Sequence, residues 1–143
     1  MATYFLQNLK YQTLLPLLVG MSLILGGCQN LKVSDCNQLN EVTNSGKSLP
    51  VAKNSDEFMQ LSQSLGQLNL KIQAIALQDQ NLNTYKNEFS QLYEAMAQAS
   101  SQISQAATNS DRNLLIQSRQ SLRTLNQQEL SLVAAVNKYC IGN

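Results

Sequence analysis

Few residues in this chain of 143 have side chains that commonly do chemistry. There is no histidine, so the usual general base near neutral pH is missing. The nine carboxylates are scattered, and the pair Glu88 and Glu94, six residues apart, is interpreted as part of a solvated helix face. No glycine-rich phosphate loop and no Gly-x-Ser-x-Gly turn occurs. The sequence therefore predicts a non-catalytic protein with no catalytic residue, no cofactor and no metal site.

The three cysteines, Cys28, Cys36 and Cys140, are the other reactive residues, and the first of them follows an apolar run. That run covers residues 14–25, which is too short for the roughly 20 residues that span a bilayer. A short apolar run after a weakly basic start, ending in small residues, is typical of a signal peptide. The rest of the chain has no comparable apolar run.

The stretch Leu25-Gly26-Gly27-Cys28 resembles the lipobox of bacterial lipoproteins, in which Leu and two small residues precede a cysteine. The resemblance covers residues 1–28 and implies that residues 1–27 are a signal peptide that is cleaved. It also implies that lipid is attached to the thiol of Cys28, which becomes the first mature residue. Several acyl chains, at about 0.8 kcal/mol per buried CH₂, hold a protein on a membrane without a spanning helix. The competing interpretation is an ordinary buried cysteine after an apolar helix.

The resemblance also bears on location. In Gram-negative lipoproteins, the residue after the lipidated cysteine influences sorting, and here that residue is Gln29 rather than Asp. We therefore expect a cell-envelope protein on the outer membrane, facing the periplasm, rather than on the inner membrane. The mature part is similar to small helical envelope lipoproteins, with a closing Asn137-Lys138-Tyr139-Cys140, and this likeness implies no activity.

Lipidation of Cys28 would leave Cys36 and Cys140, one near each end of the mature domain. Outside the cytoplasm such a pair is most simply a disulfide. It would close a loop of about 100 residues, for which chain entropy gives roughly 4–5 kcal/mol of stabilisation. A redox-active pair is the alternative, but catalytic thiols favour Cys-x-x-Cys spacing or an electropositive setting, and neither is present.

Apolar residues recur at steps of three and four through most of the mature chain, and this spacing predicts an all-α fold. We expect a tether over residues 28–35 and a helical domain over residues 36–143. The expected helices are a short one near 35–44 and three longer ones over 55–77, 80–107 and 110–140.

Two architectures remain open from this pattern. The polar stretch 78–81 contains no obligatory helix breaker, so residues 55–107 could form one long helix in a helical hairpin. The alternative is an antiparallel three-helix bundle, which covers the apolar residues of the first long helix better. Both include the short N-terminal helix and are closed by the disulfide. Asn54 or Ser55 is expected to cap one helix, and Ser110 or Asn109 the last.

An antiparallel turn about residue 109 predicts which residues of the last two helices face each other. Apolar residues meet apolar ones in this register, and opposite charges meet. The facing pairs are Leu92 with Leu125, Tyr85 with Leu132, Ile103 with Leu114, Glu94 with Arg123, and Asp79 with Lys138.

One helix face carries a row of arginines, Arg112, Arg119 and Arg123, spaced seven and four residues apart. Such a row is a candidate contact for an anionic partner or for lipid headgroups. The plainer interpretation is a solvated row that pairs with neighbouring acids and water.

A second candidate is the aromatic ladder Tyr85, Phe89 and Tyr93, which could bind a ligand or belong to the bundle core. The net charge of +1, without any basic block, speaks against nucleic-acid binding. We expect a membrane-anchored helical module that binds an envelope protein or supports envelope structure. The alternative is a periplasmic chaperone-like or small-ligand-binding protein.

Overall fold

The computed structural model describes the backbone of residues 27–142 and the side chains of residues 31–142. Within this range the fold is all-α, as predicted, with four α-helices and one short 3-10 helix. The elements are α1 (Gly27–Ser45), η1 (Gly46–Ser48), α2 (Ser55–Gln73), α3 (Gln80–Thr108) and α4 (Arg112–Ile141). Residues 1–26 of the expected signal peptide, and the side chain of Cys28, lie outside the described residues.

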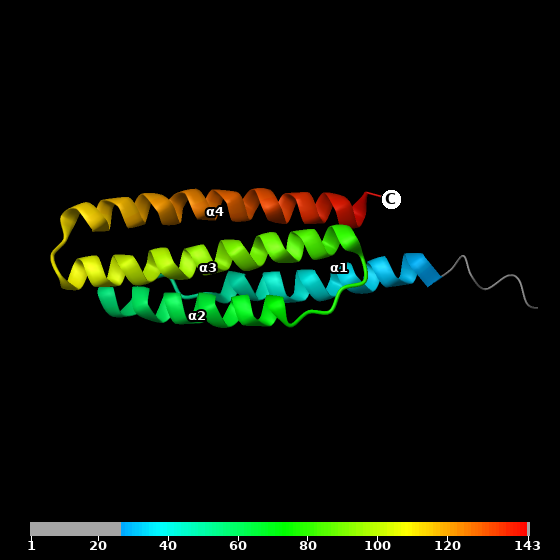
Figure 1. Cartoon of the computed structure of the whole chain (residues 1–143), viewed down its shortest axis with the longest axis horizontal. Helices are drawn as coiled ribbons and strands as arrows, with labels where there is room; N and C mark the ends of the chain where they lie inside the picture. The colour runs from blue at the N-terminus through cyan, green and yellow to red at the C-terminus, as the bar shows by residue number, and fades with distance from the viewer. Residues whose placement is uncertain (1–26, 143) are drawn as a thin grey trace, which may run out of the picture.

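Helix α3 is the centre of the bundle. Helices α2 and α4 both run antiparallel to α3 and pack along it, while α1 lies against the other three near one end (Figure 1). Ten residues of α3 are buried but only two of α4, so α4 is the peripheral helix. The largest fully buried side chains are Tyr93, Phe89, Leu39, Leu65 and Ile72.

The chain turns between α2 and α3, which confirms the three-helix arrangement and rejects one helix over 55–107. Side chains of α3 hold this turn without glycine or proline. The backbone carbonyl of Ile75 accepts a hydrogen bond from Lys86 Nζ at 3.1 Å. The carbonyl of Leu77 accepts one from Asn83 Nδ2 at 2.8 Å. Because these contacts satisfy carbonyls that have left the helix, α2 ends at residue 73 rather than at 77.

Two predicted helix caps have different outcomes. Asn54 caps α2, as predicted, by accepting a hydrogen bond from the backbone N–H three residues later. The prediction for α4 was wrong, because Asp111 rather than Ser110 or Asn109 is the cap, accepting from the Leu114 N–H at 3.0 Å. Ser110 has φ 57, in the left-handed region, and this tight turn moves the capping position to the next residue.

Helix α1 is longer than the helix predicted near 35–44, and residues 28–35, expected as a tether, are helical. Leu39 of α1 is fully buried in the core. The disulfide between Cys36 and Cys140 joins α1 to the last turn of α4, at what we call the disulfide end of the bundle. Beyond this bridge α1 extends past the ends of α3 and α4 (Figure 1).

At the opposite end, which we call the hairpin end, a short turn connects α3 to α4 (Figure 1). Residues 49–54 lead the chain from η1 to the start of α2 at this end. There the hydroxyl of Ser55 lies 2.9 Å from that of Thr108 and donates to the carbonyl of Ser104 at 3.1 Å. Helix α1 does not reach the hairpin end, so only three helices form the bundle there.

Candidate functional site

The disulfide end is held by a compact set of polar contacts. Cys36 and Cys140 are bonded, with Cα atoms 6.0 Å apart, as the cysteine count predicted. The adjacent Asp35 is buried, and its carboxylate accepts hydrogen bonds from the backbone N–H groups of Gln78 and Asp79 at 2.7 and 2.8 Å. These two residues directly precede α3, so the hydrogen bonds and the disulfide together tie α1 to α3 and α4 and are structural in character.

Asp79 adds a second connection at this end. One oxygen of its carboxylate caps α3 by accepting from Leu82 N–H, and the other accepts from the Tyr139 hydroxyl at 2.9 Å. Burial opposes ionisation, but these hydrogen bonds, one from Asn81 and the charge of Lys32 outweigh it, so the pKa of Asp79 lies below its ordinary value of 3.8. The Lys32 ammonium also lies 4.1 Å from the centre of the Tyr139 ring.

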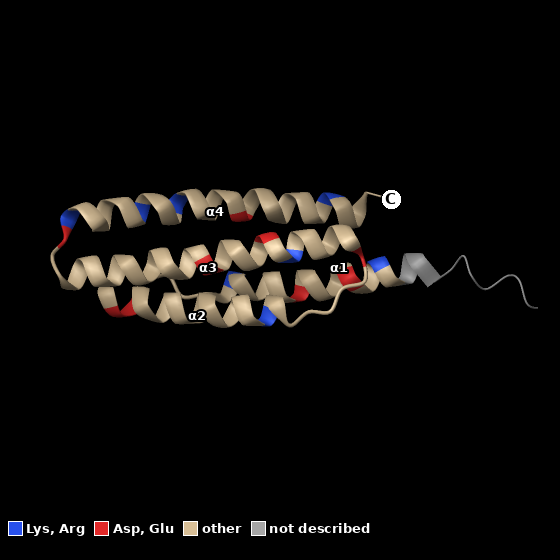
Figure 2. Cartoon of the chain, in the orientation of Figure 1, with Lys and Arg blue, Asp and Glu red and all other residues tan. Residues whose placement is uncertain are grey.

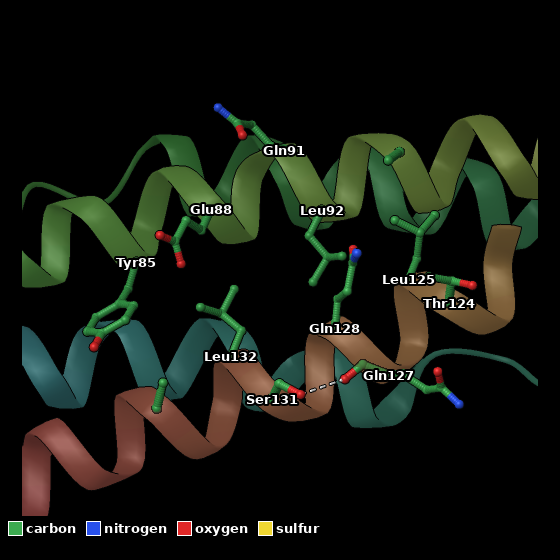
Figure 3. Close-up of a pocket in the computed structure, with 12 residues that line it drawn as sticks. Tyr85, Glu88, Gln91, Leu92, Thr124, Leu125, Gln127, Gln128, Ser131 and Leu132 are labelled. Carbon is green, nitrogen blue, oxygen red and sulfur yellow. Dashed lines mark hydrogen bonds between the residues drawn. The ribbon is translucent and has the colours of Figure 1, made fainter.

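An apolar groove of about 670 Å³ lies between α3 and α4. Leu92 of α3 and Leu125 and Leu132 of α4 point into it (Figure 3). Its polar rim is mainly uncharged, with Glu88 as its one acidic residue. The rim residues are Glu88, Gln91, Thr124, Gln127, Gln128 and Ser131.

The groove exists because α4 is covered on one side only. Helix α4 packs along α3 and touches α1 near the disulfide, while α2 lies on another side of α3. Leu125 and Leu132 are therefore only partly buried, although they belong to the apolar face that the sequence identified. A further helix laid along α3 and α4 would cover these leucines, so the groove has dimensions that suit a helix.

Below the groove, a buried hydrogen bond links the two helices that form it. The Tyr93 hydroxyl donates to Glu129 Oε1 at 2.6 Å, and Tyr93 has no exposed surface. Burial, together with the hydrogen bond and the negative charge of Glu129, raises the pKa of Tyr93 well above its ordinary value of 10.0. Tyr93 therefore stays a neutral phenol that donates this hydrogen bond, and the contact fixes α4 against α3.

The predicted aromatic ladder is divided between two environments. Phe89 and Tyr93 are buried and stacked, with ring centroids 6.0 Å apart, so they belong to the core. Tyr85 is half-buried, lines the groove and meets the ring of Tyr139 edge-on. Of the three aromatic residues, only Tyr85 is available to a ligand in the groove.

Helices α3 and α4 pair in an antiparallel arrangement, as predicted, and the residues of two predicted apolar pairs lie in one groove. Leu92 with Leu125, and Tyr85 with Leu132, line the same groove. This register was the signal that could have located the groove from the sequence. The polar rim residues Thr124 and Ser131 carried no such signal, because exposed uncharged residues are common throughout the chain.

The predicted ion pairs are wrong. Glu94 lines a polar depression between α2 and α3, away from α4, so it cannot meet Arg123. Asp79 bonds to Tyr139 rather than to Lys138. Glu94 is also separated from Glu88, which lines the apolar groove, so these two carboxylates form no common site.

The predicted arginine row is exposed on α4, toward the hairpin end. None of Arg112, Arg119 and Arg123 forms a hydrogen bond or ion pair with another residue that the structure describes. Figure 2 shows basic positions along the first half of α4. The structure therefore leaves the row open to solvent.

Two other kinds of site, a metal centre and a membrane span, have no candidate in residues 27–142. No group of three or more Cys, Asp or Glu side chains in this range is arranged to hold a metal ion. No helix in this range is long and apolar enough to cross a membrane.

Comparison with known proteins adds no relative. No protein-family model, no curated protein and no solved structure matches this chain.

Proposed function

We propose that this protein is a lipid-anchored, non-catalytic helical module of the bacterial cell envelope that binds a protein partner. The anchor is lipid on Cys28, and outer-membrane attachment facing the periplasm is favoured over the inner membrane. The resemblance of Leu25-Gly26-Gly27-Cys28 to a lipobox supports this proposal. The Cys36–Cys140 disulfide also supports it, because such bridges persist mainly in oxidising compartments.

The observation that carries the binding role is the groove between α3 and α4. It extends from Tyr85 to Ala95 on α3, which is about 15 Å at 1.5 Å per residue. This length and the apolar floor suit two or three turns of an amphipathic helix, the mode in which side chains spaced by one turn enter a groove. The rim, with Glu88 as its one charged residue, can form hydrogen bonds with such a helix without the cost of desolvating many charges.

A crosslinking experiment in cells tests the binding role. A photoreactive residue replaces Gln128 on the groove rim, and a control replaces the exposed Lys71 on α2. We expect one reproducible protein adduct in the membrane fraction from position 128 and none from position 71. The same adduct from both positions, or none from position 128 in repeated trials, would contradict a specific partner in the groove.

The size of the groove favours a second candidate function, binding of small apolar ligands or of unfolded clients. Its volume of about 670 Å³ lies within the range of about 300–1,000 Å³ that small-molecule sites occupy. This function predicts that the purified protein suppresses aggregation of an unfolded model client. Leu92→Gln in the groove should weaken the suppression, and Lys71→Gln should not. No suppression by the wild-type protein would remove this candidate.

A further inference from the structure

Helix α4 has a second surface that the groove does not include. Its outer side carries residues at alternating steps of four and three, the spacing of a coiled-coil seam. We call this surface the outer seam, and it spans about 27 Å at 1.5 Å per residue. Its residues are Arg112, Ile116, Arg119, Arg123, Asn126 and Leu130.

Every residue of the outer seam is exposed. Ile116 is 59% and Leu130 is 71% exposed, which makes them two of the large apolar residues that the described core leaves uncovered. Two exposed apolar side chains that flank Arg119, Arg123 and Asn126 are unusual for a helix face that only contacts water. The spacing and the two exposed apolar residues together favour a helix as the occupant.

The charges on α4 indicate the chemistry of that occupant. The outer seam contains three arginines and no acid. Glu129, the one acidic residue of α4, is turned toward α3 by its hydrogen bond with Tyr93. Asp111, beside Arg112 in the sequence, caps the helix by accepting from Leu114 N–H. The cations of the seam therefore lack acidic partners within the described residues, and a partner with carboxylates would complement them.

Two other occupants fit less well. A second copy placed antiparallel on the seam would bring Arg119 close to Arg123 of its mate, which is repulsive. A lipid surface would need a broad apolar face for insertion, whereas Ile116 and Leu130 lie about 21 Å apart along the helix. Asn126 and Arg123 occupy the space between them.

We propose that the outer seam of α4 binds an acidic amphipathic helix of a partner protein. Apolar residues of that helix would cover Ile116 and Leu130, and its Asp or Glu side chains would pair with Arg112, Arg119 and Arg123. This inference depends neither on the lipid anchor nor on occupation of the groove, so it names a separate contact surface.

The test uses a synthetic helical peptide of about three heptads, with leucines placed to meet the two apolar residues and glutamates placed to meet the arginines. A control peptide has glutamine at each glutamate position. Affinity for the full processed protein in neutral detergent is measured by fluorescence anisotropy. We expect the glutamate peptide to bind about tenfold more tightly than the glutamine peptide, with the difference shrinking at high salt.

Matched protein variants distinguish a specific effect of the arginines in the outer seam from a general effect of the net charge of the protein. The variant R112Q/R119Q/R123Q should lose about tenfold in affinity for the glutamate peptide. The variant K47Q/K53Q/K71Q removes the same charge from exposed sites elsewhere and should keep wild-type affinity. All substituted residues are exposed, and far-UV circular dichroism checks that both variants remain folded.

Three results would overturn the proposal. The first is equal affinity for the two peptides, and the second is an equal loss in the two triple variants. The third is failure of the glutamate peptide to bind while phosphatidylglycerol vesicles bind the wild-type protein and not R112Q/R119Q/R123Q. That last result would assign the seam to an anionic lipid surface.

A crosslinking experiment in cells determines the chemistry of the natural partner. A photoreactive residue at Ile116 is crosslinked in cells, and the attached partner peptide is sequenced by mass spectrometry. We expect a segment with apolar residues at heptad spacing and an excess of Asp and Glu. A neutral or basic segment would overturn the proposal. This arm is independent of the adduct from Gln128, so failure at the seam and failure of the groove are distinguishable.

Discussion

The disulfide is expected to supply a large part of the stability of this domain. Cys36 and Cys140 are 104 residues apart in the sequence, so the bridge closes nearly the whole described chain. For a loop of this length, the chain-entropy model gives about 4.7 kcal/mol at 25 °C. Small domains typically have a free energy of unfolding of 5–15 kcal/mol, so removal of the bridge should be a severe change.

The double variant C36A/C140A removes the bridge without leaving a thiol at either position. We expect its Tm to fall by roughly 15–20 °C relative to wild type, measured by far-UV circular dichroism under non-reducing conditions. Reduced wild-type protein is the control and should melt near the variant, because both lack the same link. A fall in Tm of less than about 3 °C would refute the reasoning, because it would show that contacts such as the Asp35 hydrogen bonds hold α1 and α4 without the bridge.

Two further predictions concern the polar contacts. Tyr93→Phe should lower the free energy of unfolding by about 1–3 kcal/mol in urea titrations, because Glu129 loses its buried donor. The folded-state pKa of Tyr93 is raised, so wild-type stability should fall more steeply than that of the variant as the pH rises above about 10. Asp111→Ala removes only a helix cap and should lower the free energy of unfolding by about 1 kcal/mol. Asp79→Ala removes a helix cap and also the hydrogen bond from Tyr139, so it should lower the free energy of unfolding by about 2 kcal/mol. The folded-state pKa of Asp79 is lowered, so its contribution to stability should be present above about pH 4 and lost as the pH falls further. Equal losses of stability in Asp79→Ala and Asp111→Ala, or identical pH profiles of stability for wild type and Asp79→Ala, would contradict the second contact of Asp79.

The helices and their pairing were predictable because they depend on the spacing of apolar residues. The register about residue 109 placed Leu92 opposite Leu125 and Tyr85 opposite Leu132, and these pairs line the groove. The disulfide was predictable once Cys28 was assigned to lipidation. The first inference depends on the periodicity of apolar residues and the second on the number of cysteines, and a single sequence shows both.

Other features depend on contacts between segments that are distant in the sequence. Nothing near residues 74–79 breaks a helix, and the turn there is held by Lys86, Asn83 and the remote Asp35. Helix α1 is mostly polar and has little apolar periodicity, so its length was underestimated. Such hydrogen bonds form only after the helices have packed, and for that reason they leave no local pattern.

Charged pairs were the least predictable part of the site. The register brings Glu94 and Arg123 to the same level of the hairpin, but it does not specify the side of each helix on which they lie. Glu94 is turned toward α2, and Arg123 is on the outer seam. Exposed charges gain little from pairing, so packing of apolar residues determines their direction.

The most direct test of the proposed envelope role is the intact mass of the protein extracted from membranes of the cells that produce it. We expect a chain that begins at Cys28, carries acyl groups on that residue and contains the Cys36–Cys140 disulfide. Cys28→Ser should yield unlipidated protein, released from the membrane or retained as an unprocessed precursor. A mature wild-type protein that begins at Met1 without lipid would contradict the proposal that this helical module is anchored through Cys28.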